Sequence, residues 1–242
     1  MFKKSVVLSS EVHANLKFNA VGGFSYAKNL HMVPICATEF YLAAREYPIV
    51  FAKAQDEYVP VVITGLKEGE NLYVDDAGFW SAKYVPATIR AYPFGFVNQD
   101  EENSLVLIDE AYEGFSQKDG TPLFDASKAL TKDLEMKLDF LRQHKGQVAV
   151  TKEFVRKLQE HDLLIERVAQ FGNLEKPEFQ VNGVWVIDEK KLYALKDKIL
   201  LDLTKKGYLA LATAQLMSMQ SFGELFQKMN DPLSNAKKNT IN

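Results

Sequence analysis

Two copies of a short phrase set an arginine, a tyrosine and a proline at a fixed spacing. Residues 45–51 read Arg-Glu-Tyr-Pro-Ile-Val-Phe, and residues 90–96 read Arg-Ala-Tyr-Pro-Phe-Gly-Phe. If Arg45 and Arg90 converge, their guanidinium groups form forks that match a peptide carboxylate. Aromatic side chains near an arginine are typical of recognition hot spots. Those that would form the floor of such a site are Tyr47, Trp80, Tyr92 and Phe94.

The same phrases also have a structural explanation. Proline moves the preceding residue out of the α region, so one helix should end at Tyr47 and another near Tyr92. The alternating apolar residues after each proline can then begin a strand. In this interpretation the arginines satisfy carbonyl groups at helix ends, and the aromatic side chains fill the core. The residue types favour this explanation, with the six-residue binding site as the alternative.

Carboxylates suggest a second kind of chemistry. Glu39, Asp75 or Asp109 could act as a general acid or base in an enzyme that modifies a peptide or a small molecule. A deep pocket that holds a carboxylate with a perturbed pKa would favour this enzyme. A shallow aromatic groove or an exposed sheet edge would instead favour a binding protein. A purely structural subunit is a third alternative.

Metal and cofactor signals are weak in this sequence. Cys36 is the only cysteine, and a small buried side chain explains it better than a reactive thiol does. Asp75 and Asp76 read as a turn because they lack the alternating ligands of a calcium loop. The histidines lack metal-ligand spacing; they are His13, His31, His144 and His161. Because no phosphate loop or dinucleotide fingerprint is present either, we expect no metal and no organic cofactor.

Composition narrows the class of partner and the location. The net charge of −3 argues against a protein that binds nucleic acid by neutralising phosphates. No apolar run approaches the ~18 residues of a membrane-spanning helix. The apolar stretch at residues 6–8 is shorter than the core of a secretory signal. We therefore expect a cytoplasmic protein whose partner is a peptide or protein client.

The periodicities predict an α+β fold, with an antiparallel sheet packed against C-terminal helices. Residues 1–112 should be mostly sheet with one short helix that begins near Thr38. The first three of four strand candidates should form a meander, because their connections are short. The four lie at residues 48–52, 58–65, 71–75 and 104–109.

Residues 126–230 should be mostly helical, with a frayed tail at 235–242. One helix is expected over 127–144, with Leu130, Leu134, Leu138 and Leu141 on one face. A second is expected from a cap at Thr151 to Gly172. Two more are expected over 192–206 and 208–229, separated by Gly207.

A late hairpin over residues 178–188 interrupts the helical half. Asn182-Gly183 is a strong signal for its turn. Isolated hairpins are marginal in water, so this one should extend the N-terminal sheet. That pairing would make residues 1–242 a single domain.

The last predicted helix presents an apolar stripe with two methionines. Such stripes can take a partner helix, but core packing is the better explanation at ordinary helical spacing. The stripe consists of Leu209, Ala212, Leu216, Met219, Phe222, Phe226 and Met229.

The order of several phrases resembles the SapC family of bacterial proteins. Val33-Pro34, Glu39-Phe40 and the phrase at 47–51 are similar to the opening of that family. The stretch 69–75, with Gly78 and Trp80, matches the family's glycine-x-asparagine-aliphatic-aromatic-valine-aspartate pattern. Further similar phrases include Val85-Pro86, the residues 90–94, Ile108-Asp109-Glu110, Leu123-Phe124-Asp125 and the residues 186–190. The resemblance spans residues 20–228.

The family takes its name from surface-array (S-layer) biology in a Gram-negative bacterium. The resemblance therefore implies a connection with surface proteins, but it implies no reaction and transfers no catalytic residue. Our leading hypothesis is a non-catalytic accessory protein that binds a client linked to S-layer, surface or secreted proteins. The alternative is the enzyme that acts through carboxylates in a pocket.

Overall fold

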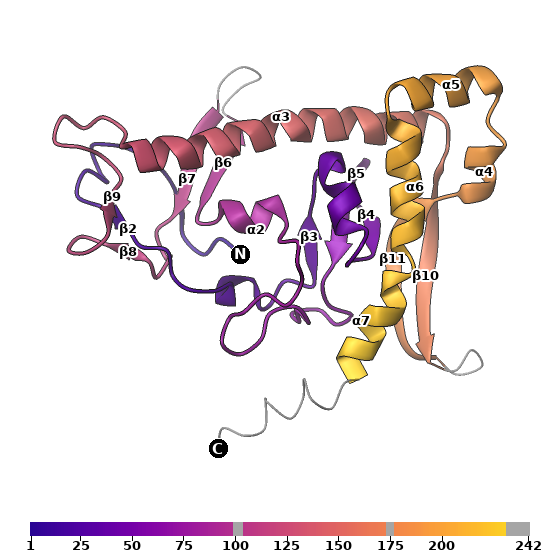
Figure 1. Ribbon diagram of the computed structural model, residues 1–242, viewed down its shortest axis with the longest axis horizontal. Helices are drawn as coiled ribbons and strands as arrows, with labels where there is room; N and C mark the ends of the chain where they lie inside the picture. The colour runs from indigo at the N-terminus through magenta and orange to yellow at the C-terminus, as the bar shows by residue number, and fades with distance from the viewer. Residues whose placement is uncertain (99–103, 173–176, 231–242) are drawn as a thin grey trace. The chain divides into compact units, whose positions relative to one another are not determined.

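A computed structural model describes residues 1–98, 104–172 and 177–230 (Figure 1). The chain divides into two compact units, and each is assembled from two separate segments. Unit 1 consists of Met1–Gly23 and Ala87–Gly146, and unit 2 consists of Phe24–Pro86 and Gln147–Asn242. Helices combine with antiparallel sheets, which confirms the α+β class. The tail expected at 235–242 lies outside the described residues.

Unit 1 holds two small antiparallel sheets. The first has the strand order β1-β7-β6 and the second the order β8-β2-β9. The strands of the first are β1 (Ser5–Val7), β6 (Phe94–Asn98) and β7 (Ser104–Asp109). Those of the second are β2 (Lys17–Phe18), β8 (Phe115–Ser116) and β9 (Thr121–Pro122). The bounds of β7 match the strand predicted at 104–109.

The core of unit 1 is apolar and includes the predicted leucine face. Helix α2 (Ala87–Ala91) precedes β6, and the first half of α3 (Lys132–Glu160) belongs to this unit. Leu130 packs against the core, whose buried members are Phe94, Ile108, Leu123, Phe124, Leu134, Leu138 and Leu141. The predicted face is therefore confirmed for Leu134, Leu138 and Leu141, whereas Leu130 precedes the helix and forms a bridge with Phe124.

Unit 2 is built on a five-stranded antiparallel sheet. Its strand order is β10-β11-β4-β5-β3. The strands are β3 (Met32–Pro34), β4 (Ile49–Ala54), β5 (Glu57–Ile63), β10 (Leu164–Gly172) and β11 (Pro177–Ile187). The predicted strands 48–52 and 58–65 are confirmed as β4 and β5. The strand expected at 71–75 was wrong: only Val74 forms a bridge, to Trp80, because the chain turns where Asn71 Oδ1 accepts the Tyr73 N–H.

The late hairpin joins this sheet, but its turn is not where the sequence indicated. Strands β10 and β11 form the hairpin, and β11 pairs with β4. Strand β11 runs straight through Asn182-Gly183, so the hairpin expected over 178–188 was wrong in its turn. Arg167 pairs with Val184 and Ala169 with Val181, which leaves two residues of β11 opposite one of β10. Gly183 has a φ of +69°, as a β-bulge allows. A positive φ suits a bulge as well as a turn, which explains the error.

Helix α3 is one continuous helix of 29 residues. It replaces the predicted helices at 127–144 and from Thr151 to Gly172. Thr151 lies inside it and is no cap: its hydroxyl donates to the Gln147 carbonyl at 2.7 Å and accepts the Ala37 N–H at 2.8 Å. The helix ends at Glu160, and β10 begins four residues later. The apolar residues expected in the second helix therefore lie partly in a strand.

Short helices complete unit 2. The early ones are two 3₁₀ turns, η1 (Ser25–Ala27) and η2 (Ala37–Glu39), and α1 (Phe40–Ala43). The late ones are α4 (Glu189–Tyr193), α5 (Asp197–Lys205), α6 (Tyr208–Ser218) and α7 (Ser221–Asn230). Gly207, with a φ of +76°, separates α5 from α6 as predicted. No helix in the described part of the chain is long and apolar enough to cross a bilayer.

Helix α6 packs against β4 and β11 of the sheet (Figure 1). Gln215 joins the two strands, because its amide donates to the Ile49 carbonyl at 2.9 Å and its oxygen accepts the Ile187 N–H at 3.2 Å. The Ser218 hydroxyl accepts the Ile49 N–H at 2.9 Å. The predicted apolar stripe is buried or half-buried along its length. Ala212 and Phe222 are its buried members, so core packing accounts for the stripe in part.

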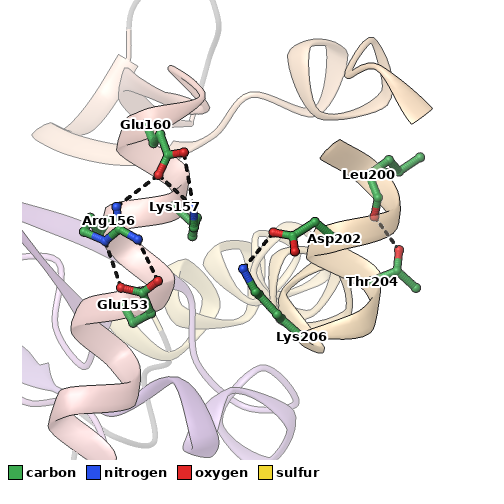
Figure 2. Close-up of polar contacts among 8 residues, drawn as sticks. All are labelled: Glu153, Arg156, Lys157, Glu160, Leu200, Asp202, Thr204 and Lys206. Carbon is green, nitrogen blue, oxygen red and sulfur yellow. Dashed lines mark hydrogen bonds and ion pairs between the residues drawn. The ribbon is translucent and has the colours of Figure 1, made fainter. Parts of the chain in front are cut away.

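Ion pairs lie on the exposed surface at the C-terminal end of α3 and along helix α5. Figure 2 shows the paired residues, which are Glu153, Arg156, Lys157 and Glu160 on α3 and Asp202 and Lys206 at α5. It also shows the Thr204 hydroxyl, which donates to the Leu200 carbonyl at 2.7 Å. Arg156 Nε and Nη2 each donate to a Glu153 carboxylate oxygen at 2.8 Å. Arg156 Nη1 donates to Glu160 Oε2 at 3.1 Å. Lys206 pairs with Asp202 at 2.8 Å. These pairs follow the i,i+3 and i,i+4 spacing of neighbouring side chains on a helix. Exposed pairs of this kind contribute little to stability.

Candidate functional site

The two Arg-x-Tyr-Pro phrases build the same local structure twice. The first leads from α1 through Tyr47-Pro48 into β4, and the second from α2 through Tyr92-Pro93 into β6. The predicted change from helix to strand is confirmed in both. The six predicted binding residues divide between the units: Arg45, Tyr47 and Trp80 belong to unit 2, and Arg90, Tyr92 and Phe94 belong to unit 1.

In unit 2 the aromatic residues of this set are part of the core. Tyr47 is fully buried, and its hydroxyl donates to the Tyr84 carbonyl. The same hydroxyl accepts the Trp80 indole N–H at 2.8 Å. The Tyr73 ring packs against both, 4.7 Å from Tyr47 and 6.4 Å from Trp80 by ring centroids. Burial raises the pKa of the Tyr47 phenol well above its usual range. Tyr47 and Trp80 therefore belong to the core of unit 2, whereas Arg45 is exposed.

In unit 1 the corresponding residues lie at a cavity. Arg90 is exposed in the last turn of α2, and its guanidinium carbon lies 5.0 Å from the Phe140 ring centroid. Tyr92 and Phe94 are buried behind it. The Tyr92 hydroxyl donates to Asp109 Oδ2 at 2.9 Å, which fixes the tyrosine between α2 and β6. The cavity has a volume of about 290 Å³. Its lining residues are Phe18, Arg90, Ala91, Tyr92, Phe94, Asp133, Met136, Lys137 and Phe140.

Nearly half of the cavity lining comes from α3, and the sequence reasoning missed it. Asp133, Met136, Lys137 and Phe140 follow the spacing i, i+3, i+4 and i+7 of one helix face. This face adjoins the leucine face that was predicted as core. The helical spacing could have placed a lysine and an aromatic residue together on it, but nothing in the sequence indicates that they meet Arg90.

Two cations stand at this cavity against aromatic rings. Lys137 Nζ lies 4.4 Å from the Phe18 ring centroid, within the range of a cation–π contact. Its distance to Asp133 Oδ2 is 3.6 Å, which is long for a hydrogen bond. Arg90 makes the corresponding contact with Phe140. The arrangement suits an anionic group attached to an apolar body.

The three candidate acids of the enzyme hypothesis hold backbone segments in place. Asp109 is fully buried and accepts the Lys3 N–H at 2.9 Å, the Lys4 N–H at 2.7 Å and the Ala111 N–H at 3.2 Å, besides the Tyr92 hydroxyl. Burial alone would raise the pKa of Asp109, but these hydrogen bonds outweigh it and lower the pKa. Such a carboxylate stays ionised, and both of its oxygens already accept hydrogen bonds from the protein itself.

Glu39 and Asp75 are engaged in a similar way. Glu39 is buried, accepts the Cys36 N–H at 2.7 Å and accepts the Tyr84 hydroxyl at 2.7 Å. Asp75 is exposed in a turn and accepts the Phe79 N–H at 2.9 Å, as the turn interpretation predicts. Cys36 is buried, and its burial, with the nearby Glu39, raises the pKa of its thiol to about 11. None of these three residues lines the cavity at Arg90.

Comparison with known proteins agrees with the resemblance seen in the phrases. The comparison with curated proteins found no match, and neither did the comparison with solved structures. The SapC family model matches residues 8–225, which is most of the chain. The chain therefore belongs to the SapC family.

Proposed function

We propose that this protein is a non-catalytic, cytoplasmic accessory protein that binds a peptide or protein client through the cavity at Arg90. The cavity carries the proposal, because it combines an exposed arginine with aromatic side chains, the usual composition of a recognition hot spot. Three of the six residues predicted for client binding line it.

The family name supports a client that is connected with S-layer, surface or secreted proteins. The net charge of −3 favours a protein or peptide over nucleic acid. An enzyme that acts through carboxylates has less support, since Glu39, Asp75 and Asp109 hold backbone or hydroxyl groups of the protein itself.

Photocrosslinking tests the proposal. A photoreactive benzoylphenylalanine replaces Met136, which lines the cavity and is 56% exposed. The full chain is then irradiated in lysate of its source bacterium, and crosslinked products are identified by mass spectrometry. We expect surface or secreted proteins or their precursors to be captured from this position. The control carries the same group at Met217, which is 65% exposed on α6 of unit 2.

The two phrases supply a matched pair of substitutions. Arg90→Ala should reduce capture at least five-fold, whereas Arg45→Ala removes the arginine from the equivalent place in unit 2 and should leave capture unchanged. Both variants should melt like the unmodified chain. Capture that is equal from Met136 and Met217, or that is insensitive to Arg90→Ala, would reject the cavity as the client site.

A further inference from the structure

We infer that the edge of strand β10 binds an extended segment of a partner protein as an antiparallel sixth strand of the unit 2 sheet. In this pairing an acidic residue of the partner lies opposite Arg167 and a basic residue lies opposite Glu166. Addition of a strand to a sheet edge is a recurring mode of peptide recognition. The edge belongs to unit 2, so the inference goes beyond the proposed function, whose cavity lies in unit 1.

Strand β10 is the outermost strand of the five-stranded sheet (Figure 1). It has nine residues, more than the roughly 5–6 of an ordinary strand, and none of them is proline. Within the described part of the chain, the backbone of residues 164–170 is hydrogen-bonded only to β11. The N–H and C=O groups that point away from β11 are therefore a template for another strand. The opposite edge is a poorer template, because β3 has three residues and ends in Pro34.

Two neighbouring charges on this edge define the partner. Glu166 lies opposite the half-buried Trp185, and the next residue, Arg167, lies opposite the buried Val184. The two charged side chains therefore point to opposite faces of the sheet. Both are exposed, and neither side chain has a hydrogen bond or an ion pair among the described residues.

The order of these charges sets the order of residues in the partner. In an antiparallel pair, the partner residue opposite Arg167 comes immediately before the partner residue opposite Glu166. Opposite charges that face each other across two strands stabilise the pair, and like charges destabilise it. The partner segment therefore has an acidic residue followed by a basic residue.

Val168 adds an apolar position to this pattern. It is 49% exposed. It lies opposite the bulge at Asn182 and Gly183, where the glycine brings no side chain that could cover it. A β-branched residue of the partner opposite Val168 packs well against it. This residue comes immediately before the acidic one, so the recognised segment has the order apolar, acidic, basic.

A second copy of this chain does not fit the charges. Closed dimers are two-fold symmetric, and the axis between two antiparallel edge strands is perpendicular to the sheet. Such an axis keeps every side chain on its own face. Glu166 of one copy and Arg167 of the other then lie on opposite faces and cannot pair in any register. Registers centred on either residue bring like charges together, so the edge favours a different chain over its own copy.

Two six-residue peptides of identical composition provide the probes. Acetyl-Thr-Val-Glu-Lys-Val-Thr-amide places its glutamate opposite Arg167 and its lysine opposite Glu166. Acetyl-Thr-Val-Lys-Glu-Val-Thr-amide places like charges at both positions. Each peptide is titrated into the full chain, and binding is followed by NMR shifts of the β10 backbone amides. We expect the first peptide to bind at least five-fold more tightly at low salt, with a smaller preference in 1 M NaCl because exposed charges are screened.

An exchange of the two charges in the chain makes the test specific. Glu166→Arg combined with Arg167→Glu should invert the preference, so that the second peptide binds more tightly. The matched control, Glu189→Lys combined with Lys190→Glu, exchanges an exposed acid and an exposed base on α4 and should leave the preference unchanged. Bound peptide should also slow hydrogen exchange of the outward-facing amides of residues 164–170, which reports the new backbone hydrogen bonds.

Equal binding of the two peptides to the unmodified chain would overturn this inference. Tighter binding of the second peptide would do the same, because it indicates a parallel strand. Binding that leaves amide exchange in β10 unchanged would mean that the charges attract the peptide without strand addition, which also overturns the inference. A dimer in sedimentation whose β10 amides are protected without peptide would assign the edge to a second copy instead. None of these results bears on capture at Met136, which tests the cavity separately.

Discussion

Tyr47 and Tyr92 occupy the same place in the two phrases, but their hydroxyl groups hold different partners. Tyr47 joins Trp80 to the Tyr84 carbonyl inside unit 2, and Tyr92 reaches the buried Asp109 in unit 1. The residue types predicted a tyrosine in a folded core or in a binding site. The structure assigns Tyr47 to the core, and Tyr92 contributes to the core and to the wall of the cavity. Sequence alone could not separate them, because both tyrosines stand in the same Arg-x-Tyr-Pro pattern and their partners are set by the fold.

Asp109 gives the first prediction. In Asp109→Asn an NH₂ group replaces one of the two oxygens that accept the backbone N–H groups of Lys3 and Lys4, so at least one donor in this part-buried site loses its acceptor. We expect the free energy of unfolding to fall by about 1–3 kcal/mol at pH 7. Urea unfolding measures this loss, and Asp119→Asn, an exposed site in the same unit, should have no effect.

The loss should depend on pH. The folded pKa of Asp109 lies below its unfolded value near 3.9, so its contribution is fully present above about pH 4 and disappears as the pH falls through the folded pKa. The stability gap between the unmodified chain and Asp109→Asn should therefore be constant from pH 7 to 5 and shrink below pH 4. A gap that stayed unchanged down to pH 2 would contradict the role given to this carboxylate.

Cys36 gives a prediction from its buried thiol. With a pKa of about 11, roughly a thousandth of the thiol is ionised at pH 8. Only the thiolate is nucleophilic, so iodoacetamide should label the folded chain at least 100-fold more slowly than the chain in 8 M urea. Cys36 is the only cysteine, so mass spectrometry reads its labelling directly. Rapid labelling under native conditions would make this thiol a reactive candidate again.

Among the elements, local sequence signals correctly predicted where strands form and where one helix ends, but they did not predict the length of a long helix. Strand β7, the pair β4 and β5, and the break at Gly207 follow the sequence prediction. Helix α3 does not, because Thr151 resembles the cap at which a new helix begins, although one helix continues through it. Thr151 is kept there by the long-range contact with Ala37.

The bulge at Asn182-Gly183 can be tested against Gly146. A Cβ at Gly183 would meet no atom within 4 Å, but its φ of +69° disfavours any other residue, so Gly183→Ala should destabilise the chain by about 1 kcal/mol. Gly146 also has open space, but it lies within α3, so Gly146→Ala should stabilise the chain by about 0.5–1 kcal/mol. Thermal or urea unfolding of both variants checks the opposite signs. Two changes of the same sign would argue against the bulge.

At the scale of the whole molecule, the chain passes between the units at Gly23, at Pro86 and within α3 at Gly146. Sequence reasoning described two successive halves, 1–112 and 126–230, because apolar periodicity shows that a face is buried and not what buries it. The sheet of unit 2 illustrates this limit, since β4 pairs with β11, which lies far along the chain. The sequence did predict that the late hairpin pairs with the N-terminal sheet, because two isolated strands are stable only as part of a larger sheet.

This interleaving leads to a prediction about the fragment 1–120, which we expect to be unstable when expressed alone. Its part of unit 2 lacks β11 and α6, so β4 loses a neighbouring strand and Ile49 loses its hydrogen bonds to Gln215 and Ser218. Its part of unit 1 lacks Leu134, Leu138 and Leu141 of the core.

Circular dichroism melts and amide NMR spectra of the fragment and the full chain provide the measurement. The fragment should show neither a cooperative melt nor dispersed amide signals. The matched control joins residues 1–23 to 87–146 through a flexible linker and so contains all of unit 1. If that chain folds while 1–120 does not, the missing partners explain the instability, and not the shorter length. A native-like melt of 1–120 would show instead that its strands fold without the second half, which the sheet order β10-β11-β4-β5-β3 does not lead us to expect.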